Sequence, residues 1–116
     1  MQVIIAGSRS FTDYSLLKRK LTHLFSNCAA SIGIVSGTAR GADRLGERYA
    51  AEHGMRVTRF PADWDRHGKS AGYKRNAAMA QFADGLVAFW DGRSRGTGHM
   101  IDLAREHGLR IRVVRI

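Results

Sequence analysis

Five short runs of apolar residues recur along the chain, separated by longer stretches in which polar and apolar residues mix. The runs are rich in β-branched side chains and end at glycine or polar residues, which is typical of strands buried in a sheet. We therefore predict strands at about residues 2–7, 31–36, 55–60, 84–90 and 110–115.

The stretches between these runs carry apolar residues at helical spacing, which predicts amphipathic helices that pack on a core. The four predicted apolar faces consist of Leu17, Leu21, Leu24 and Phe25; Ala42, Leu45, Tyr49 and His53; Tyr73, Ala77 and Ala80; and Met100, Ile101, Ala104 and His107. Thr12 or Asp13 is suited to cap the first helix, and Gly54 and Gly108 are suited to end the second and fourth.

The alternation of strands and helices predicts an α/β fold, a single Rossmann-like three-layer domain over residues 1–116. A mainly parallel five-stranded sheet would lie between the helices, and we expect the order 3-2-1-4-5. This order reverses the winding between the first and fourth strands, where ligands bind at the carboxyl ends of the strands. Arg110, Arg112 and Arg115 would place charge on an exposed edge of the sheet.

Glycine-rich turns follow three of the predicted strands. The first turn is Gly7, Ser8 and Arg9, where glycine permits close approach of a ligand to the backbone. The second turn, residues 36–43, starts the second helix with small residues, and its candidate ligand contacts are Ser36, Gly37, Thr38, Ala39 and Gly41. Its spacing matches neither a dinucleotide fingerprint nor a Walker loop, so no cofactor of these types is expected. Asp43 either accepts hydrogen bonds from a ribose or interacts with the helix dipole.

The segment of residues 60–76 is predicted to leave the third strand as a long polar loop and to enter a helix near Ser70. Long polar loops in compact domains are often functional. Trp64 either stacks on a base or covers the core. The candidate ligand-binding residues of this segment are Asp63, Trp64, Lys69, Arg75 and Asn76.

The turn after the fourth strand, residues 90–100, combines glycines and hydroxyl groups at the start of a helix, which suits a phosphate. Its candidate ligand contacts are Trp90, Asp91, Gly92, Ser94, Gly96 and Thr97. Asp91 is either a catalytic or ribose-binding carboxylate or a turn-forming residue.

Composition narrows the classes of partner. The formal net charge is +9, and 15 of the 19 basic residues are arginine, which binds phosphate in a bidentate manner. The charge indicates either an anionic partner, such as a nucleotide or nucleic acid, or a solvated basic surface. The histidines lack the spacing of a metal site, and no metal is expected. We also expect no membrane span and no secretion signal, and the single Cys28 agrees with a cytoplasmic location.

Six ordered motifs give the chain a specific resemblance that runs over nearly its whole length. They are GSRSF at residues 7–11, SGTARGAD at 36–43, FPADW at 60–64, GKSAG at 68–72, RNAAM at 75–79 and WDGRSRGT at 90–97. These motifs resemble the YspA/YpsA-related branch of the SLOG superfamily. The resemblance implies a Rossmann-like fold, a nucleotide-derived ligand and pairing of subunits into a homodimer or higher homo-oligomer.

The same superfamily includes the LONELY GUY phosphoribohydrolases and the DprA/Smf DNA-binding proteins, which imply two alternatives to simple ligand binding. One is N-glycosidic cleavage of a nucleoside monophosphate, with Arg75 on the phosphate and Asp91, or else Asp43, as the carboxylate. This chain has Asn76 in place of the enzymes' lysine and Met100 in place of their catalytic glutamate. Methionine cannot stabilise an oxocarbenium-like transition state, so the sequence favours binding over hydrolysis. The other alternative is binding of single-stranded nucleic acid.

Overall fold

The predicted sheet is confirmed in the computed structural model, which describes residues 1–28 and 31–116. Its strands are β1 (Gln2–Gly7), β2 (Gly33–Ser36), β3 (Val57–Arg59), β4 (Gly85–Trp90) and β5 (Arg110–Arg115). All pairings are parallel, in the order β3-β2-β1-β4-β5. The central strand β1 therefore pairs with β2 on one side and β4 on the other, and the winding reverses there as expected.

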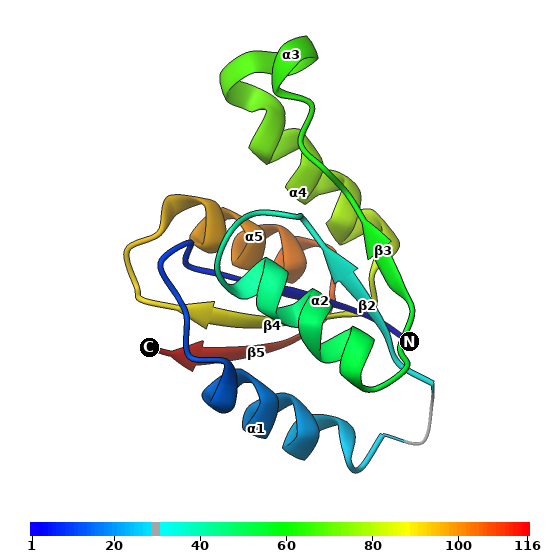
Figure 1. Ribbon diagram of the computed structural model, residues 1–116. Coiled ribbons are helices and arrows are strands. Elements are labelled where there is room, and N and C mark those ends of the chain that lie inside the picture. Colours follow the sequence, from blue (N-terminus) through cyan, green and yellow to red (C-terminus); the bar gives the residue numbers. More distant parts are fainter. Residues whose placement is uncertain (29–30) are drawn as a thin grey trace.

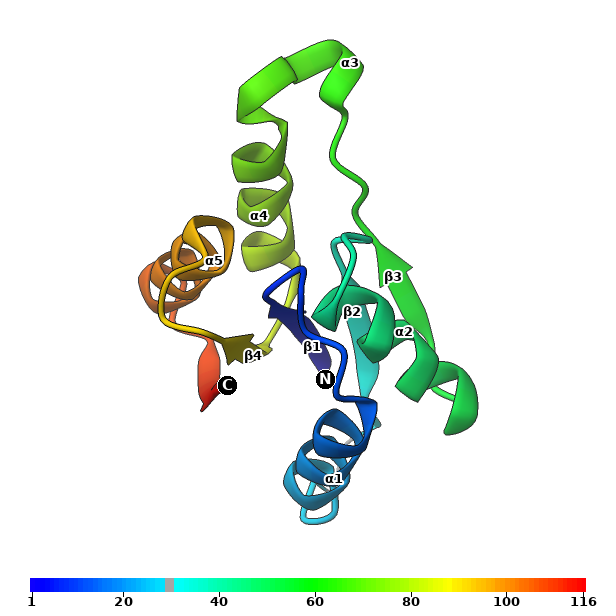
Figure 2. The same ribbon diagram turned by 60° about the vertical axis from the view of Figure 1, so that its left-hand side comes forward.

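Helices cover both faces of this sheet (Figures 1 and 2). They are α1 (Tyr14–Phe25), α2 (Ala42–Glu52), α3 (Trp64–His67), α4 (Ala71–Phe82) and α5 (Arg95–Glu106), with a 3₁₀ turn η1 (Gly68–Ser70) between α3 and α4. Asp13 caps α1 by accepting a hydrogen bond from the Leu16 amide at 3.0 Å. The helices α1, α2, α4 and α5 lie where the four apolar faces were predicted, but the face predicted for α4 is partly wrong. Tyr73 is 49% exposed, and α4 buries Ala71, Asn76, Met79 and Ala80. His53 and His107, predicted on the faces of α2 and α5, are also exposed.

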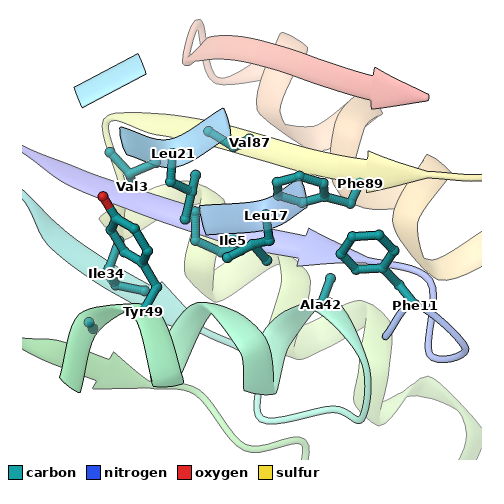
Figure 3. Packing of buried hydrophobic residues seen from close by; sticks show 11 residues of the cluster. Val3, Ile5, Phe11, Leu17, Leu21, Ile34, Ala42, Tyr49, Val87 and Phe89 are labelled. Carbon is teal, nitrogen blue, oxygen red and sulfur yellow. The ribbon is translucent and has the colours of Figure 1, made fainter. Parts of the chain in front are cut away.

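Alternate residues of β1 belong to two separate hydrophobic clusters. Val3 and Ile5 point to the side of α1 and α2, where they pack with Leu17, Leu21 and Tyr49 (Figure 3). Ile4 and Ala6 point to the opposite side, where the cluster includes Met79 of α4 and the α5 residues Met100, Ile101 and Ala104. Side chains that alternate between the faces of a strand explain why β1 is buried on both sides.

The prediction of a long polar loop after β3 is partly wrong. Asp63 accepts a hydrogen bond from the Arg66 amide at 3.1 Å, which caps the short helix α3. The chain then passes through η1 into α4, whose N-cap is Ser70. Both ribbon views show α3 at the tip of an arm that extends beyond the sheet (Figures 1 and 2). Local capping therefore makes this polar segment helical although it has no buried side chain in α3 or η1.

A close contact between α2 and β1 generates a stability prediction. A Cβ at Gly46 would lie 2.7 Å from the Cβ of Ile5, so Gly46→Ala should overpack the core. We expect a loss of about 1–3 kcal/mol in the free energy of unfolding, measured by urea denaturation, although alanine favours helices. The control is Gly72→Ala in α4, where the nearest atom would be 3.6 Å away, and its stability should be unchanged or higher. Equal stabilities of the two variants would contradict this packing.

Candidate anion-binding site

A cavity of about 410 Å³ opens at the carboxyl edge of the sheet, beside the reversal between β1 and β4. It brings together the end of β1, the loop before α2, one face of α4 and the start of α5. Its lining residues are Ala6, Gly7, Arg9, Ser10, Ala39, Asp43, Arg75, Asn76, Met79, Ser94, Arg95, Gly96, Thr97 and Met100. The three glycine-rich turns thus meet at one cavity, and residues from α4 complete it.

Buried Ser8 joins the three turns from below the cavity. Its backbone amide donates to the Phe89 carbonyl at 3.1 Å, and its own carbonyl accepts from the Phe11 and Ala42 amides at 3.2 and 3.5 Å. Its hydroxyl lies 3.1 Å from the hydroxyl of Ser94. Ser8 was expected to contact a ligand, but it does not line the cavity and instead fixes the position of the turns around it.

Gly37 lies where the side chains of Asp43 and Arg75 come together. The Arg75 Nη1 donates to the Gly37 carbonyl at 2.5 Å, and Asp43 Oδ2 accepts from the Ala39 amide at 3.2 Å. A Cβ at Gly37 would lie 2.7 Å from Arg75 Nη1 and 2.8 Å from Asp43 Oδ2. Only glycine leaves room here for a carboxylate and a guanidinium on one backbone turn.

Asp43 is an unusual carboxylate because only 6% of the residue is exposed. Burial raises its pKa to about 6, and the Ala39 amide and the charge of Arg75 act in the opposite direction. Burial also lowers the pKa of Arg75, which the nearby charge of Asp43 opposes. Asp43 is the single acidic residue among the described residues that line the cavity, so the lining is basic overall.

The start of α5 presents backbone N–H groups to the cavity. Asp91 accepts hydrogen bonds from the Arg93 and Ser94 amides, both at 2.8 Å, which lowers its pKa and shapes the turn. Within residues 1–28 and 31–116, no side chain caps α5 at Ser94. The first amides of the helix, which have no partner inside it, therefore remain available to an anion.

The side chain of Asn76 anchors this terminus to α4. Its Nδ2 donates to the Gly96 carbonyl at 3.2 Å, and its Oδ1 accepts from Arg75 Nε at 3.0 Å. The buried side-chain amide of Asn76 thus fixes the position of both the Arg75 guanidinium and the start of α5. Asn76 was expected from its motif to contact a ligand, and it also positions the neighbouring groups.

Several predicted site residues lie outside the cavity lining. Ser36 donates to Glu47 at 2.7 Å and accepts from the Thr38 amide at 3.0 Å, so it stabilises its own turn. Thr38 adopts a φ of 65°, and Gly41 and Gly92 adopt φ values of 80° and 82° in their turns. Trp90 Nε1 donates to the Ser94 carbonyl at 3.0 Å. The structure places the Asp91 carboxylate in the turn before α5 and not at the cavity.

The arm residues Asp63, Trp64 and Lys69 are likewise not part of the lining. Trp64 is 52% exposed, and its indole packs near Gly72 of α4: a Cβ added at Gly72 would be 3.6 Å from Trp64 Cη2. Conversely, Ser10, Met79 and Arg95 line the cavity and were not predicted. Arg95 lies within the motif of the fourth turn. Its position at the start of a helix is the signal by which the sequence could have indicated it.

The chain is an α/β protein with a basic-lined cavity at the point where the sheet reverses its winding. The chain belongs to the YspA, cpYpsA-related SLOG family, whose model matches residues 1–67. It is 37% identical over 114 residues to the Gene 61 protein of Mycobacterium phage D29, covering 93% of this chain and 91% of the phage protein.

A solved structure has the same fold. The chain is similar to DNA processing protein A from Helicobacter pylori, a protein whose mode of binding single-stranded DNA has been described structurally. The TM-score is 0.70 at 20% identity over 97% of this chain, which spans 64% of the length of that protein. In the described ranges, no helix is both long and apolar enough to cross a membrane.

The buried carboxylate predicts an unusual dependence of stability on pH. Since the pKa of Asp43 rises from 3.8 to about 6 on folding, the native state binds more protons than the unfolded state between these values. Its contribution to stability should therefore decline as the pH rises from about 4 to about 6, by on the order of 3 kcal/mol. Asp43→Asn removes this decline, so urea denaturation should show the variant gaining stability relative to the parent across that range. Parallel pH profiles would contradict the assignment, and Asp65→Asn on the exposed arm serves as the control.

Proposed function

We propose that this protein binds a nucleotide or a nucleotide-derived ligand through its phosphate and ribose at the cavity beside β1 and β4. The observation that carries the proposal is the pairing of an uncapped α5 terminus with a basic lining that includes Arg9, Arg75 and Arg95. Helix amides and guanidinium groups are the donors that bind phosphate in proteins. Membership of the SLOG family supports a ligand of this class.

Each part of such a ligand has a counterpart in the site. The phosphate would accept hydrogen bonds from the first amides of α5 and from the exposed guanidinium of Arg9. The carboxylate of Asp43 would accept hydrogen bonds from a ribose hydroxyl deeper in the cavity. The indole of Trp64 is half exposed on the arm outside the cavity lining, and it would stack against the base.

Two positions favour binding over cleavage of the N-glycosidic bond. Met100 is buried and lines the cavity at the position where the related hydrolases carry a glutamate. Asp91, the first alternative carboxylate, accepts hydrogen bonds from the backbone amides of its own turn. Asp43 is the carboxylate left for such chemistry, and chromatography of nucleotide mixtures with the parent and Asp43→Asn would detect any released base.

The proposal predicts that Arg9→Ala weakens nucleotide binding without loss of stability. Arg9 is exposed and lines the cavity, so its removal takes away a charged hydrogen bond and leaves the core intact. We expect a Kd about tenfold to a hundredfold higher by isothermal titration calorimetry with AMP, GMP, NAD and ADP-ribose. Arg56→Ala changes the net charge equally at the amino end of β3 and should bind normally. Failure of the parent protein to bind any of these compounds would refute the proposal.

A second candidate function is binding of single-stranded nucleic acid at the same cavity, which would hold one phosphate and sugar of the strand. The fold shared with DNA processing protein A and the net charge of +9 favour it. It predicts that affinity for an oligonucleotide falls steeply as salt is raised, because bound phosphates release counterions. Fluorescence anisotropy across a salt series measures this slope, and an affinity independent of salt would exclude it.

A further inference from the structure

A second hollow lies beside α5 and β5 and adjoins the candidate site. It has a volume of about 870 Å³ and shares Ser94 and Arg95 with the first cavity. We call it the α5 groove. Its lining includes Arg93, Arg105 and Arg115 together with the rings of Tyr73 and Trp90. The N-terminus of α5 thus lies between two adjacent hollows with basic linings.

The positive charge of the α5 groove is nearly uncompensated. Asp102 is the one acidic residue in its described lining. It lies 3.8 Å from Arg105, but both side chains are about two-thirds or more exposed, at 67% for Arg105 and 72% for Asp102. Exposed pairs of this kind contribute little, so Arg105 remains available. In the part of the chain that the structure describes, Arg93 and Arg95 take part in no ion pair.

Flat aromatic surfaces stand among these guanidinium groups. Tyr73 is 49% exposed, and its ring meets the His99 ring edge-on with a centroid distance of 4.5 Å. Trp90 is half-buried in the lining of the α5 groove and donates a hydrogen bond to the carbonyl of Ser94, a residue that lines both hollows. An accessible ring in a lining that carries arginines is suited to bind a stacked base and backbone phosphates.

The adjacent edge strand argues against a second copy of the chain as the occupant. β5 is the outermost strand next to the groove, and it carries Arg110, Arg112 and Arg115. Pairing of this edge with another copy would bring like charges together. An anionic chain with planar groups fits the charge and the rings, and a folded basic partner does not.

We infer that a single strand of nucleic acid passes from the candidate site over the start of α5 and along the α5 groove, where Arg105 contacts a later phosphate and Tyr73 stacks on a base. This inference rests on the proposed function, because the strand begins with the nucleotide that the cavity holds. It gives the ligand a length of more than one nucleotide and assigns contacts that a mononucleotide cannot make.

The test compares a mononucleotide with a labelled oligothymidylate of about six nucleotides. Arg105→Ala should weaken oligonucleotide binding about threefold to tenfold and reduce the slope of log affinity against log salt by about 0.7. Tyr73→Ala should weaken it about tenfold. Both variants should bind thymidine monophosphate like the parent, because neither residue lines the first cavity.

Matched control variants distinguish the loss of a contact in the α5 groove from a change in net charge or in folding. Arg56→Ala removes one positive charge at the opposite sheet edge, and Phe82→Ala removes an exposed ring at the far end of α4. Neither should change oligonucleotide affinity. Mononucleotide binding with no gain for the oligonucleotide, or with equal loss in the control variants, would overturn the groove and leave the proposed function intact. Absence of binding to both ligands would overturn both, and binding to phosphatidylserine vesicles in place of the oligonucleotide would overturn the groove assignment.

Discussion

The hydrogen bonds around Ser8 are the constraint on which the candidate site depends. One residue, 2% exposed, contacts the end of β4, the start of α2 and the turn before α5. These segments come from distant parts of the sequence, and the sheet alone would fix only the ends of their strands. Because Ser8 bonds to all of them through backbone and hydroxyl, the cavity is formed before any ligand arrives. A preformed site needs less ordering on binding.

The burial of the charged side chains of Asp43 and Arg75 is the second property that distinguishes the site. Asp43 and Arg75 share the space over Gly37, and each is held by backbone groups. Hydrogen bonds to the backbone reduce the penalty of burying a charge but do not remove it, as the raised pKa of Asp43 shows. The fold therefore retains a destabilising carboxylate at the cavity. A carboxylate whose pKa is raised by burial in a cavity is typical of functional sites, and it agrees with the candidate site.

The hydrophobic pattern was enough to predict the fold, because burial on two faces of β1 leaves a local signature. The strand order and the place of the reversal do not follow from this local pattern, because it does not say which strands pair; the expected order was a choice among doubly wound sheets, and the structure confirms it. Side-chain roles were harder to predict: Ser8 and Ser36 were interpreted as ligand contacts, yet their hydroxyls meet Ser94 and Glu47. Those partners lie 86 and 11 positions away along the chain, and no spacing rule reveals them. The α3 segment was missed because its cap acts locally in a stretch without an apolar face.

The arm formed by α3 and η1 differs from the rest of the molecule in how it is held. It contributes no buried side chain, whereas α1 and α2 are anchored in one hydrophobic cluster and α4 and α5 in the other. Opening of such a segment exposes almost no apolar surface, and its free energy is set by a few local hydrogen bonds. Trp64 therefore belongs to a part of the fold that can open locally, while Gly72, which its indole approaches, lies on the well-anchored helix α4. The indole can change position without disturbing either hydrophobic cluster, whereas the other tryptophan, Trp90, packs against one of them and would respond to global unfolding.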